Sequence, residues 1–181
     1  MRRACLPPME IRTGRLLLRS FREEDITPEY ISWLCDPNVV RFSNQRFLSH
    51  DRESALRYLQ SFQGTANDFL SIEMLEDGWR VGTMTVYRNA HHGTCDIGIM
   101  VGDRGVWGSG IGGEAWCATV GQVIREPGVR KVTGGTLRPN LAMVRIFERS
   151  GMHLEAVRAG QELLNGEPVD VLLYARFRSG D

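Results

Sequence analysis

The sequence Trp-Gly-Ser-Gly-Ile-Gly-Gly at residues 107–113 follows an apolar segment typical of a strand, 94–101, and includes the start of a segment typical of a helix, 109–125. Its glycines are unfavourable at the start of a helix unless the backbone there has a particular task. Glycine allows a sharp turn and a close approach of backbone N–H groups to a ligand, and the following helix adds its positive end. The stretch therefore predicts a seat for a phosphate or pyrophosphate group.

Two other phosphate-binding motifs fit this stretch less well. Gly108-x-Gly110-x-x-Gly113 formally matches the dinucleotide fingerprint, but that motif follows its strand immediately and has an acidic residue about 20 residues further on. Here residues 103–107 intervene after the strand, and Arg130 stands near the place of the acid. No Gly-Lys-Ser/Thr follows, which argues against a P-loop. A glycine-rich connection without a ligand is the plain alternative.

The rest of the chain predicts seven strands and four helices in one domain. Strands are expected at 15–19, 69–75, 79–87, 94–101, 130–137 and on either side of Asn165-Gly166, the last at 169–175. Helices are expected at about 30–34, 51–62, 109–125 and 140–150. Asp77-Gly78 and Asn165-Gly166 predict hairpins, while helices between strands require crossovers, so the sheet must be mixed. We expect an α+β domain over residues 11–178, preceded by a tail at 1–10.

Composition excludes several classes of protein. The chain has 181 residues, of which 42% are hydrophobic and 24% charged, and its 22 basic residues balance 22 acidic ones. This balance gives no reason to expect nucleic acid or an anionic membrane as a partner. The longest mainly apolar stretches, around 97–101 and 169–175, are too short to span a bilayer. No motif predicts a metal site, and we expect a cytoplasmic protein with reduced cysteines. The cysteines are Cys5, Cys35, Cys95 and Cys117.

Three motifs together resemble one family. The stretch Trp107–Ala115, read as W-G-x-G-x-G-x-E-A, resembles the acetyl-CoA signature of the GNAT superfamily of N-acetyltransferases, in the variant of its RimJ/RimL-like (ribosomal-protein alanine acetyltransferase-like) subgroup. Thr13–Arg19 resembles that subgroup's T-x-R-L-x-L-R opening, and Asp25, Trp33 and Asp36-Pro37 follow it. The segment from Asn140 to Met152 resembles the family's N-x-x-S…K-x-G-F motif. The resemblance covers nearly the whole chain in the right order.

The resemblance implies a fold and a cofactor site. It implies a GNAT fold, a mixed twisted sheet of about seven strands flanked by about four helices, in which a splayed strand pair forms the acetyl-CoA cleft. The backbone expected to pair with pantetheine is that of Ile99, Met100 and Val101. The N–H groups expected to cradle the pyrophosphate are those of Trp107, Gly108, Ser109, Gly110, Ile111 and Gly112. Asn140 matches the residue that bonds the pantetheine arm, although it also suits a plain helix cap. Arg104, Arg145 and Arg149 are either phosphate contacts or solvated surface residues.

The implied activity is transfer of an acetyl group to a primary amine by direct attack on the thioester. Asp96 matches an acid often found on this strand and is our candidate general base, with a salt-bridged or solvated acid as the alternative. His91 and His92 are weaker candidates, since adjacent loop histidines are commonly surface residues. Glu73 is weaker still. Relatives often carry proton donors where this chain has Met143 and Phe147.

The identity of the acceptor stays open at this point. The RimJ/RimL-like resemblance implies a protein N-terminus, and a small-molecule amine is the alternative. The stretch from His91 to Gly102 also resembles acetyltransferases of amino sugars in surface-polysaccharide biosynthesis. Arg41, Asn44 and Arg46 lie in the region that shapes the acceptor pocket in the family, and the arginines speak against a polyamine. A non-catalytic acetyl-CoA-binding sensor and a possible homodimer are further hypotheses.

Overall fold

The structure is a computed structural model that describes residues 8–179. Most of the tail expected at 1–10, Cys5 included, lies outside the described residues. The strands are β1 (Glu10–Arg12), β2 (Leu16–Ser20), β3 (Asp68–Met74), β4 (Arg80–Asn89), β5 (Thr94–Val101), β6 (Lys131–Leu137), β7 (His153–Leu164) and β8 (Glu167–Phe177). The α-helices are α1 (Pro28–Cys35), α2 (Arg52–Gln60), α3 (Ile111–Val123) and α4 (Leu141–Arg149). The short 3-10 helices are η1 (Glu23–Asp25), η2 (Asn44–Phe47) and η3 (Arg104–Val106).

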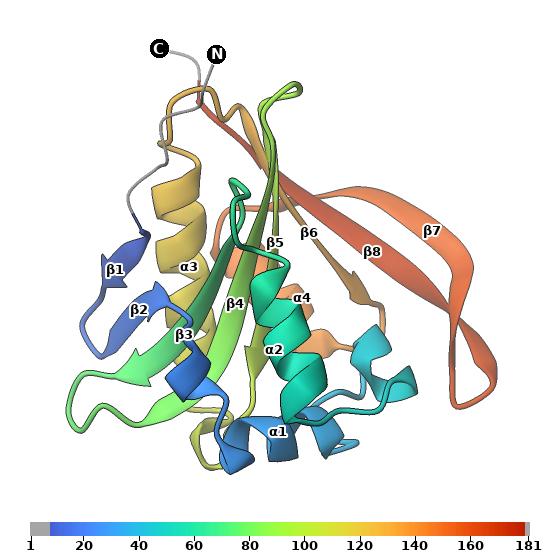
Figure 1. The fold of residues 1–181 in the computed structure, drawn as a ribbon. Coiled ribbons are helices and arrows are strands. Elements are labelled where there is room, and N and C mark those ends of the chain that lie inside the picture. The colour runs from blue at the N-terminus through green and yellow to red at the C-terminus, as the bar shows by residue number, and fades with distance from the viewer. Residues whose placement is uncertain (1–7, 180–181) are drawn as a thin grey trace.

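The strands form one mixed sheet of eight strands in the order β1-β2-β3-β4-β5-β6-β8-β7 (Figure 1). Every neighbouring pair is antiparallel except β5 and β6, which run parallel and are joined by the crossover through α3. The expected α+β class and mixed sheet are confirmed. The sheet has one strand more than expected, because the three residues of β1 extend its edge beyond β2.

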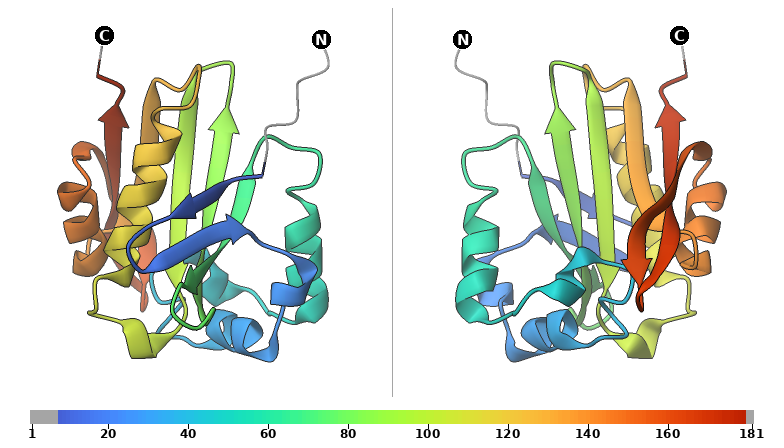
Figure 2. Two further views of the ribbon diagram at one scale, coloured as in Figure 1. Left: turned by 90° about the vertical axis from the view of Figure 1, so that its left-hand side faces the viewer. Right: turned by 90° about the vertical axis from the view of Figure 1, so that its right-hand side faces the viewer.

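Helices cover both faces of the sheet. Figure 2 shows α3 and α4 on one face and α1 and α2 on the other. The larger core lies under α3 and α4, where Trp116 and Phe147 are fully buried. A smaller, aromatic core lies under α1 and α2, where Phe21 stacks on Phe69 with a centroid distance of 4.3 Å. The sheet is therefore the middle layer of a three-layer sandwich, and β5 and β6 lie inside it, between β4 and β8.

Local sequence explains where the elements near the centre begin and end. The side chain of Asn140 accepts from Met143 N at 3.3 Å and caps α4, and Gly151 ends that helix region with a φ of 73°. The β7–β8 hairpin turns at Asn165 and Gly166, whose φ values are 54° and 85°, as a type I′ turn requires. The Asn140 cap and the Asn165-Gly166 turn were predicted from the sequence and are confirmed.

The cysteines in the described part of the chain form no disulfide. Cys35, Cys95 and Cys117 are free thiols in the part of the chain that the structure describes. Burial raises the pKa of the Cys95 thiol to about 11, so this thiol stays protonated and unreactive at neutral pH.

None of the helices between residues 8 and 179 combines the length and the apolarity needed to cross a membrane.

Candidate active site

The sheet opens between β5 and β6. The two strands are paired only over Thr94–Asp96 and Lys131–Thr133. Beyond that point β5 stays paired with β4 as far as Val101, and β6 stays paired with β8 as far as Leu137, so the two strands diverge (Figure 1). The resulting gap lies inside the sheet, and backbone groups along its edges lack the neighbouring strand that a closed sheet would supply. The expected splayed strand pair is confirmed.

The hydrogen-bond pattern decides which backbone groups of β5 face this gap. Gly102 N donates to Val81 O at 2.9 Å, and bonded and non-bonded pairs alternate along an antiparallel ladder. The backbone groups of Met100 therefore point toward β4, whereas those of Ile99 and Val101 point into the gap. The Val101 carbonyl already accepts from Trp107 Nε1 at 2.9 Å. This leaves Ile99 as the principal backbone position for a ligand arm.

The segment at residues 107–113, which we call the glycine loop, lies at the open end of the gap. Gly108 and Gly110 have φ values of 77° and 85°, which only glycine adopts without strain, and Gly110 caps α3. The N–H groups of Trp107 and Ser109 donate within the loop, to carbonyls three residues earlier, at 3.2 and 3.3 Å. Within residues 107–113, the N–H groups that donate to no acceptor in the described part of the chain are those of Gly108, Gly110, Ile111, Gly112 and Gly113. They lie at the positive end of α3, where an anion is stabilised.

An N-terminal segment anchors this loop. Glu114, in the first turn of α3, accepts from Thr13 Oγ1 at 2.5 Å, from Arg15 N at 3.0 Å and from Arg15 Nε at 2.7 Å. Arg15 Nη1 also donates to the carbonyl of Ser109 at 3.1 Å. Burial alone would raise the pKa of Glu114, but the hydrogen bonds from Thr13 and Arg15 hold it below its ordinary value. We call this contact the Arg15–Glu114 clamp; sequence reasoning found both of its motifs but not their contact.

Helices α3 and α4 meet at the mouth of the gap. A Cβ on Gly112 would lie 3.1 Å from Val101 Cγ2 and 3.6 Å from Ile146 Cδ1, so a larger residue would crowd both neighbours. Asn140 lies on the other side of the mouth, where its Nδ2 donates to Thr136 Oγ1 at 3.0 Å while its Oδ1 caps α4. The second N–H of the Asn140 amide remains for a ligand. The structure thus brings the glycine loop, Val101 and Asn140 to one end of the gap.

Asp96 lies at the last paired position of β5, where the strands begin to separate. Alternation places it on the face of α1 and α2, together with Met100, which packs against the smaller core. Its Oδ2 accepts from Thr133 Oγ1 at 2.6 Å, and its side chain is open to solvent on one side. Desolvation by the surrounding protein raises the pKa of Asp96 and outweighs the Thr133 hydrogen bond, which lowers it. A raised pKa suits a general base.

The other candidate bases lie elsewhere. His91 and His92 are exposed in the turn between β4 and β5, at the end of β5 opposite the glycine loop. Glu73 is 8% exposed and forms ion pairs with Arg19 and Arg80. The structure brings neither group to the gap, so Asp96 is the acid or base closest to it among the candidates.

No proton donor stands at the two positions where relatives often have one. Phe147 is completely buried, with Tyr174 stacked on it at a centroid distance of 4.7 Å and Trp116 edge-on at 5.2 Å. Met143 is partly buried against the same core. These residues support α4 by packing, and neither can transfer a proton. Arg145 and Arg149 are exposed on the same helix, whereas Arg104 approaches Asp36 at 3.5 Å.

A groove of about 460 Å³ opens between the segment around η2 and the tip of the β7–β8 hairpin. Pro37, Arg41, Arg46 and Phe47 line one side, and residues 163–166 line the other. Arg46 Nη2 donates to the Leu163 carbonyl at 3.1 Å and thereby joins the two walls. Figures 1 and 2 place this cyan segment beside the hairpin and near the C-terminal end of β6. Arg41 and Arg46 both line this groove, while Asn44 is exposed and is not part of its lining.

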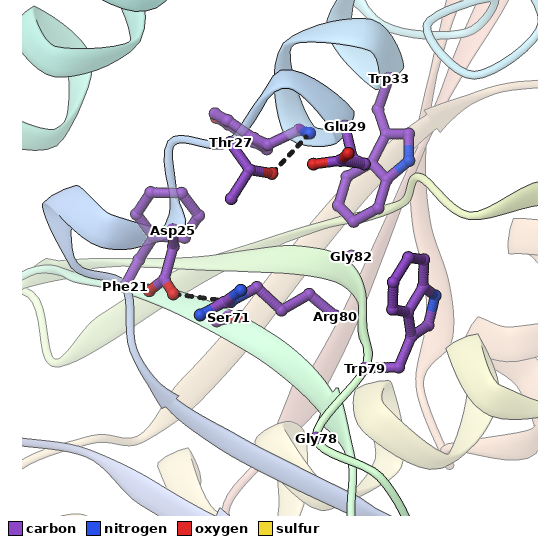
Figure 3. Close-up of a pocket in the computed structure, with 11 residues that line it drawn as sticks. Phe21, Asp25, Thr27, Glu29, Trp33, Ser71, Gly78, Trp79, Arg80 and Gly82 are labelled. Atoms are coloured by element: carbon purple, nitrogen blue, oxygen red, sulfur yellow. Dashed lines mark hydrogen bonds and ion pairs between the residues drawn. The ribbon is translucent and has the colours of Figure 1, made fainter.

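A smaller cavity of about 80 Å³ lies between α1 and the start of β4. Figure 3 shows Trp33 and Trp79 facing each other on one side and the ion pair of Asp25 with Arg80 on the other. Asp25 is fully buried and receives both Nη atoms of Arg19, at 2.7 and 2.8 Å. The charges of Asp25 and Arg80 on the wall of this cavity are therefore paired with each other. Between residues 8 and 179 no group of three or more His, Cys, Asp or Glu side chains is placed to hold a metal.

Comparisons with known proteins agree with this architecture. The family model described as acetyltransferase (GNAT) domain matches residues 15–153. The gap inside the sheet and the glycine loop at its mouth define an acetyltransferase, and the chain belongs to the GNAT family. Members of this class are acetyl-CoA-dependent N-acetyltransferases. Among curated proteins, none matches the chain.

Solved structures share the fold at low sequence identity. An acetyltransferase (GNAT family) from Bacillus anthracis is 20% identical with a TM-score of 0.80, over 94% of this chain and 99% of that chain. The ribosomal α-N-protein acetyltransferase RimL, in complex with coenzyme A, is 18% identical with a TM-score of 0.81, over 96% and 100%. Spermidine N-acetyltransferase from Vibrio cholerae, in complex with CoA and spermine, is 14% identical with a TM-score of 0.80, over 92% and 97%. Such neighbours fix the fold and leave the acceptor open.

Proposed function

We propose that the enzyme binds acetyl-CoA in the gap between β5 and β6 and transfers its acetyl group to a primary amine. The observation that carries the proposal is a gap inside the sheet that ends at a loop with unpaired N–H groups. Backbone groups of Ile99 suit the amide-bearing pantetheine arm, and the loop N–H groups suit the pyrophosphate. The spare N–H of Asn140 supports the arm from the other side, and Arg145 and Arg149 remain candidates for phosphate contacts.

The chemistry requires mainly positioning. The amine nitrogen bonds to the acetyl carbon, the carbon–sulfur bond breaks, CoA leaves as the thiolate, and the amine loses a proton. Holding the reactants together replaces much of the entropic barrier. An N–H group of β5 that faces the gap stabilises the oxyanion. Because Phe147 and Met143 cannot donate a proton, solvent protonates the thiolate, which is a tolerable leaving group with a pKa of about 8.5.

Asp96 serves as the base that accepts the proton of the amine. Its position at the last paired residue of β5, on the face covered by α1 and α2, supports this role. The need for this base depends on the acceptor. An α-amine with a pKa near 8 is partly neutral at pH 7, whereas an alkyl amine with a pKa near 10.4 is almost wholly protonated. The acceptor is a protein N-terminus, as the RimJ/RimL-like resemblance implies, or a small-molecule amine that enters through the groove.

A thiol-release assay tests the proposal. Acetyl-CoA is offered with peptides, amino sugars, polyamines and other amines, and Gly110→Trp is compared with Gly64→Trp. Both glycines have a positive φ, 85° and 70°, but Gly64 lies in an open turn after α2. We expect acceptor-dependent CoA release that Gly110→Trp abolishes and Gly64→Trp preserves. Acetyl-CoA binding without turnover of any amine would favour the sensor hypothesis, and no binding at all would refute our assignment of the glycine loop.

A further inference from the structure

The groove between η2 and the β7–β8 hairpin has the size of a small-molecule site. Its volume of about 460 Å³ falls within the range of about 300–1,000 Å³ that is typical of such sites. Its two walls are fixed relative to each other, because Arg46 donates to Leu163 O at 3.1 Å and to Ser43 O at 2.7 Å. The Arg46 guanidinium also lies 4.3 Å from the centroid of the Phe47 ring. The groove is therefore preformed.

The groove carries positive charge that the protein does not neutralise. Its lining includes two arginines and no acidic side chain. Glu162, behind the lining, approaches Arg46 at 3.7 Å and accounts for that charge. In contrast, no hydrogen bond or ion pair within residues 8–179 reaches the exposed Arg41 guanidinium, whose only aromatic contact is the Phe42 ring at 5.1 Å. An unpaired guanidinium at the rim of a groove favours an anionic ligand and disfavours a polycation.

Apolar surface lies beside this charge. Phe47 is 69% exposed and Leu163 is 56% exposed, on opposite walls of the groove. Large apolar side chains that remain this exposed next to a preformed groove are typical of a ligand-binding surface. The groove therefore combines one site for an anion with a short apolar contact surface for the body of the same molecule.

We propose that the acceptor is a small molecule that carries a phosphate or carboxylate group in addition to its primary amine, with the anionic group bound by Arg41. The inference rests on the proposed acetyl transfer and deepens it. In this proposal the amine of an acceptor held at Arg41 extends toward Asp96, which shares the face of the sheet covered by α1 and α2 with Met100. Phe47 and Leu163 contact the carbon skeleton between the two groups.

Matched pairs of acceptors provide the test. The probes are glucosamine with glucosamine 6-phosphate and ethanolamine with phosphoethanolamine, so that each pair differs only in the phosphate. Amino acids test acceptors that carry a carboxylate, and spermidine tests a polycationic acceptor. A neutral and an acidic peptide test acceptors that are protein N-termini. We expect at least one anionic small amine to show a kcat/KM at least tenfold above that of its neutral partner, with spermidine the poorest acceptor.

Variants at Arg41 connect this preference to the groove. Arg41→Gln should raise KM for the anionic acceptor roughly tenfold, the loss of a charged hydrogen bond at an accessible site, while kcat changes little. Arg41→Lys should restore part of the effect, because it keeps the charge. The matched control is Arg57→Gln, which removes an exposed arginine on α2 that pairs with Glu53 far from the groove lining. This control should keep the wild-type preference.

The outcomes separate the two proposals. Calorimetry with acetyl-CoA alone reports on the cofactor site, and Arg41→Gln should bind acetyl-CoA as tightly as the wild type. If acetyl-CoA binds but neutral and anionic amines react equally well, or if Arg41→Gln keeps the preference, the inference about the acceptor is wrong and the proposed function stands. Turnover of the acidic peptide alone would also overturn it, in favour of a protein acceptor. Failure to bind acetyl-CoA would instead refute the proposed function.

Discussion

The position of Asp96 suits its carboxylate to the role of a general base. Its raised pKa and its place at the apex of the gap predict that it accepts the proton of the amine. Asp96→Asn should lower kcat/KM for an alkyl amine by about 100-fold. In the wild type, kcat at saturating acceptor should fall as the pH drops through the Asp96 pKa, which lies above the ordinary aspartate value of about 3.9. Rate profiles from pH 4 to 9 measure both effects.

Thr133 offers the matched control for that experiment. Its hydroxyl donates to Asp96 Oδ2 at 2.6 Å and stabilises the charged carboxylate. Thr133→Val removes this hydrogen bond, so the pKa of Asp96 should rise further and the acid limb of the profile should move to higher pH. If the acid limb stays at the same pH in Thr133→Val and persists in Asp96→Asn, it reports the titration of a group other than Asp96.

The Arg15–Glu114 clamp predicts a different kinetic pattern. Arg15 acts through the loop, since it donates to Ser109 O and holds Glu114. Arg15→Ala should therefore raise KM for acetyl-CoA about tenfold, because the unpaired N–H groups lose their fixed positions. The value of kcat at saturating acetyl-CoA should change less than threefold. Steady-state kinetics with varied acetyl-CoA measure both constants.

Arg12 is the control for the clamp. It lies three residues away, and among residues 8–179 its guanidinium pairs only with the exposed Glu10. Arg12→Ala should leave both constants unchanged. A fall in kcat without a rise in KM in Arg15→Ala would contradict a role in positioning the loop.

At the residue scale the sequence predicted the positions of the glycine loop, Asn140 and Asp96. It did not predict the clamp, because Arg15 and Glu114 are separated by 99 residues and nothing in a single sequence records that contact. It also did not predict that the backbone groups of Ile99 face the gap while those of Met100 face β4. That difference follows from which residue pairs of β4 and β5 are hydrogen-bonded. Spacing identifies a motif, whereas the direction of its groups depends on the neighbouring strand.

At the scale of elements, long periodic segments and capped helices were predictable. Three elements were harder to predict, because they are short or because their side chains are exposed. The strand β1 has three residues, too few for a period of two to show, and η2 has four residues without an apolar pattern. Along β7 almost every side chain is exposed, so no alternation marks it before its turn at Asn165-Gly166. Elements that bury little surface leave little pattern in the sequence.

The divergence of β5 from β6 predicts a local change on ligand binding. Backbone N–H groups of Ile99 and Val101 face the gap and should exchange with deuterium rapidly in the free protein. Bound acetyl-CoA should slow this exchange at least tenfold, as expected for a backbone that gains hydrogen-bond partners. Mass-spectrometric hydrogen exchange with and without acetyl-CoA measures it.

The paired part of the same strand provides the internal reference. Thr94–Asp96 already pair with β6, so their exchange should change little. Equal protection of all of β5, or protection confined to the hairpin β7–β8, would place the ligand elsewhere.

At the scale of the whole molecule, the buried network around Asp25 links stability to pH. Burial alone would raise the pKa of Asp25, but hydrogen bonds from Arg19 and from Arg22 N outweigh it, so the pKa lies below its ordinary value. A lowered pKa in the folded state means that the stabilisation is complete above the unfolded-state pKa of about 3.9 and is lost as the pH falls through the folded-state pKa. Urea denaturation from pH 2 to 7 should show this loss.

Substitution separates Asp25 from other acids. Asp25→Asn removes the fully buried one of the two carboxylates that pair with Arg19 and Arg80, the other being Glu73, and should lower the free energy of unfolding at pH 7 by about 3–5 kcal/mol. It should also flatten the pH dependence below pH 4. Glu24→Gln removes a neighbouring carboxylate that is 64% exposed and should change stability by less than about 0.5 kcal/mol. Similar losses in both variants would argue against the network.

The opening between β5 and β6 has a consequence for the lifetime of the protein. In the proposed complex, a metabolite that the gene does not encode completes the central layer. A ligand at 100 times its Kd stabilises the folded state by about 2.7 kcal/mol, which lowers the unfolded fraction about 100-fold. Proteases that act on the unfolded chain would therefore degrade the protein faster in a starved cell than in a fed one. The carbon supply of the cell would then set how many copies of the enzyme survive, as well as how fast each copy works.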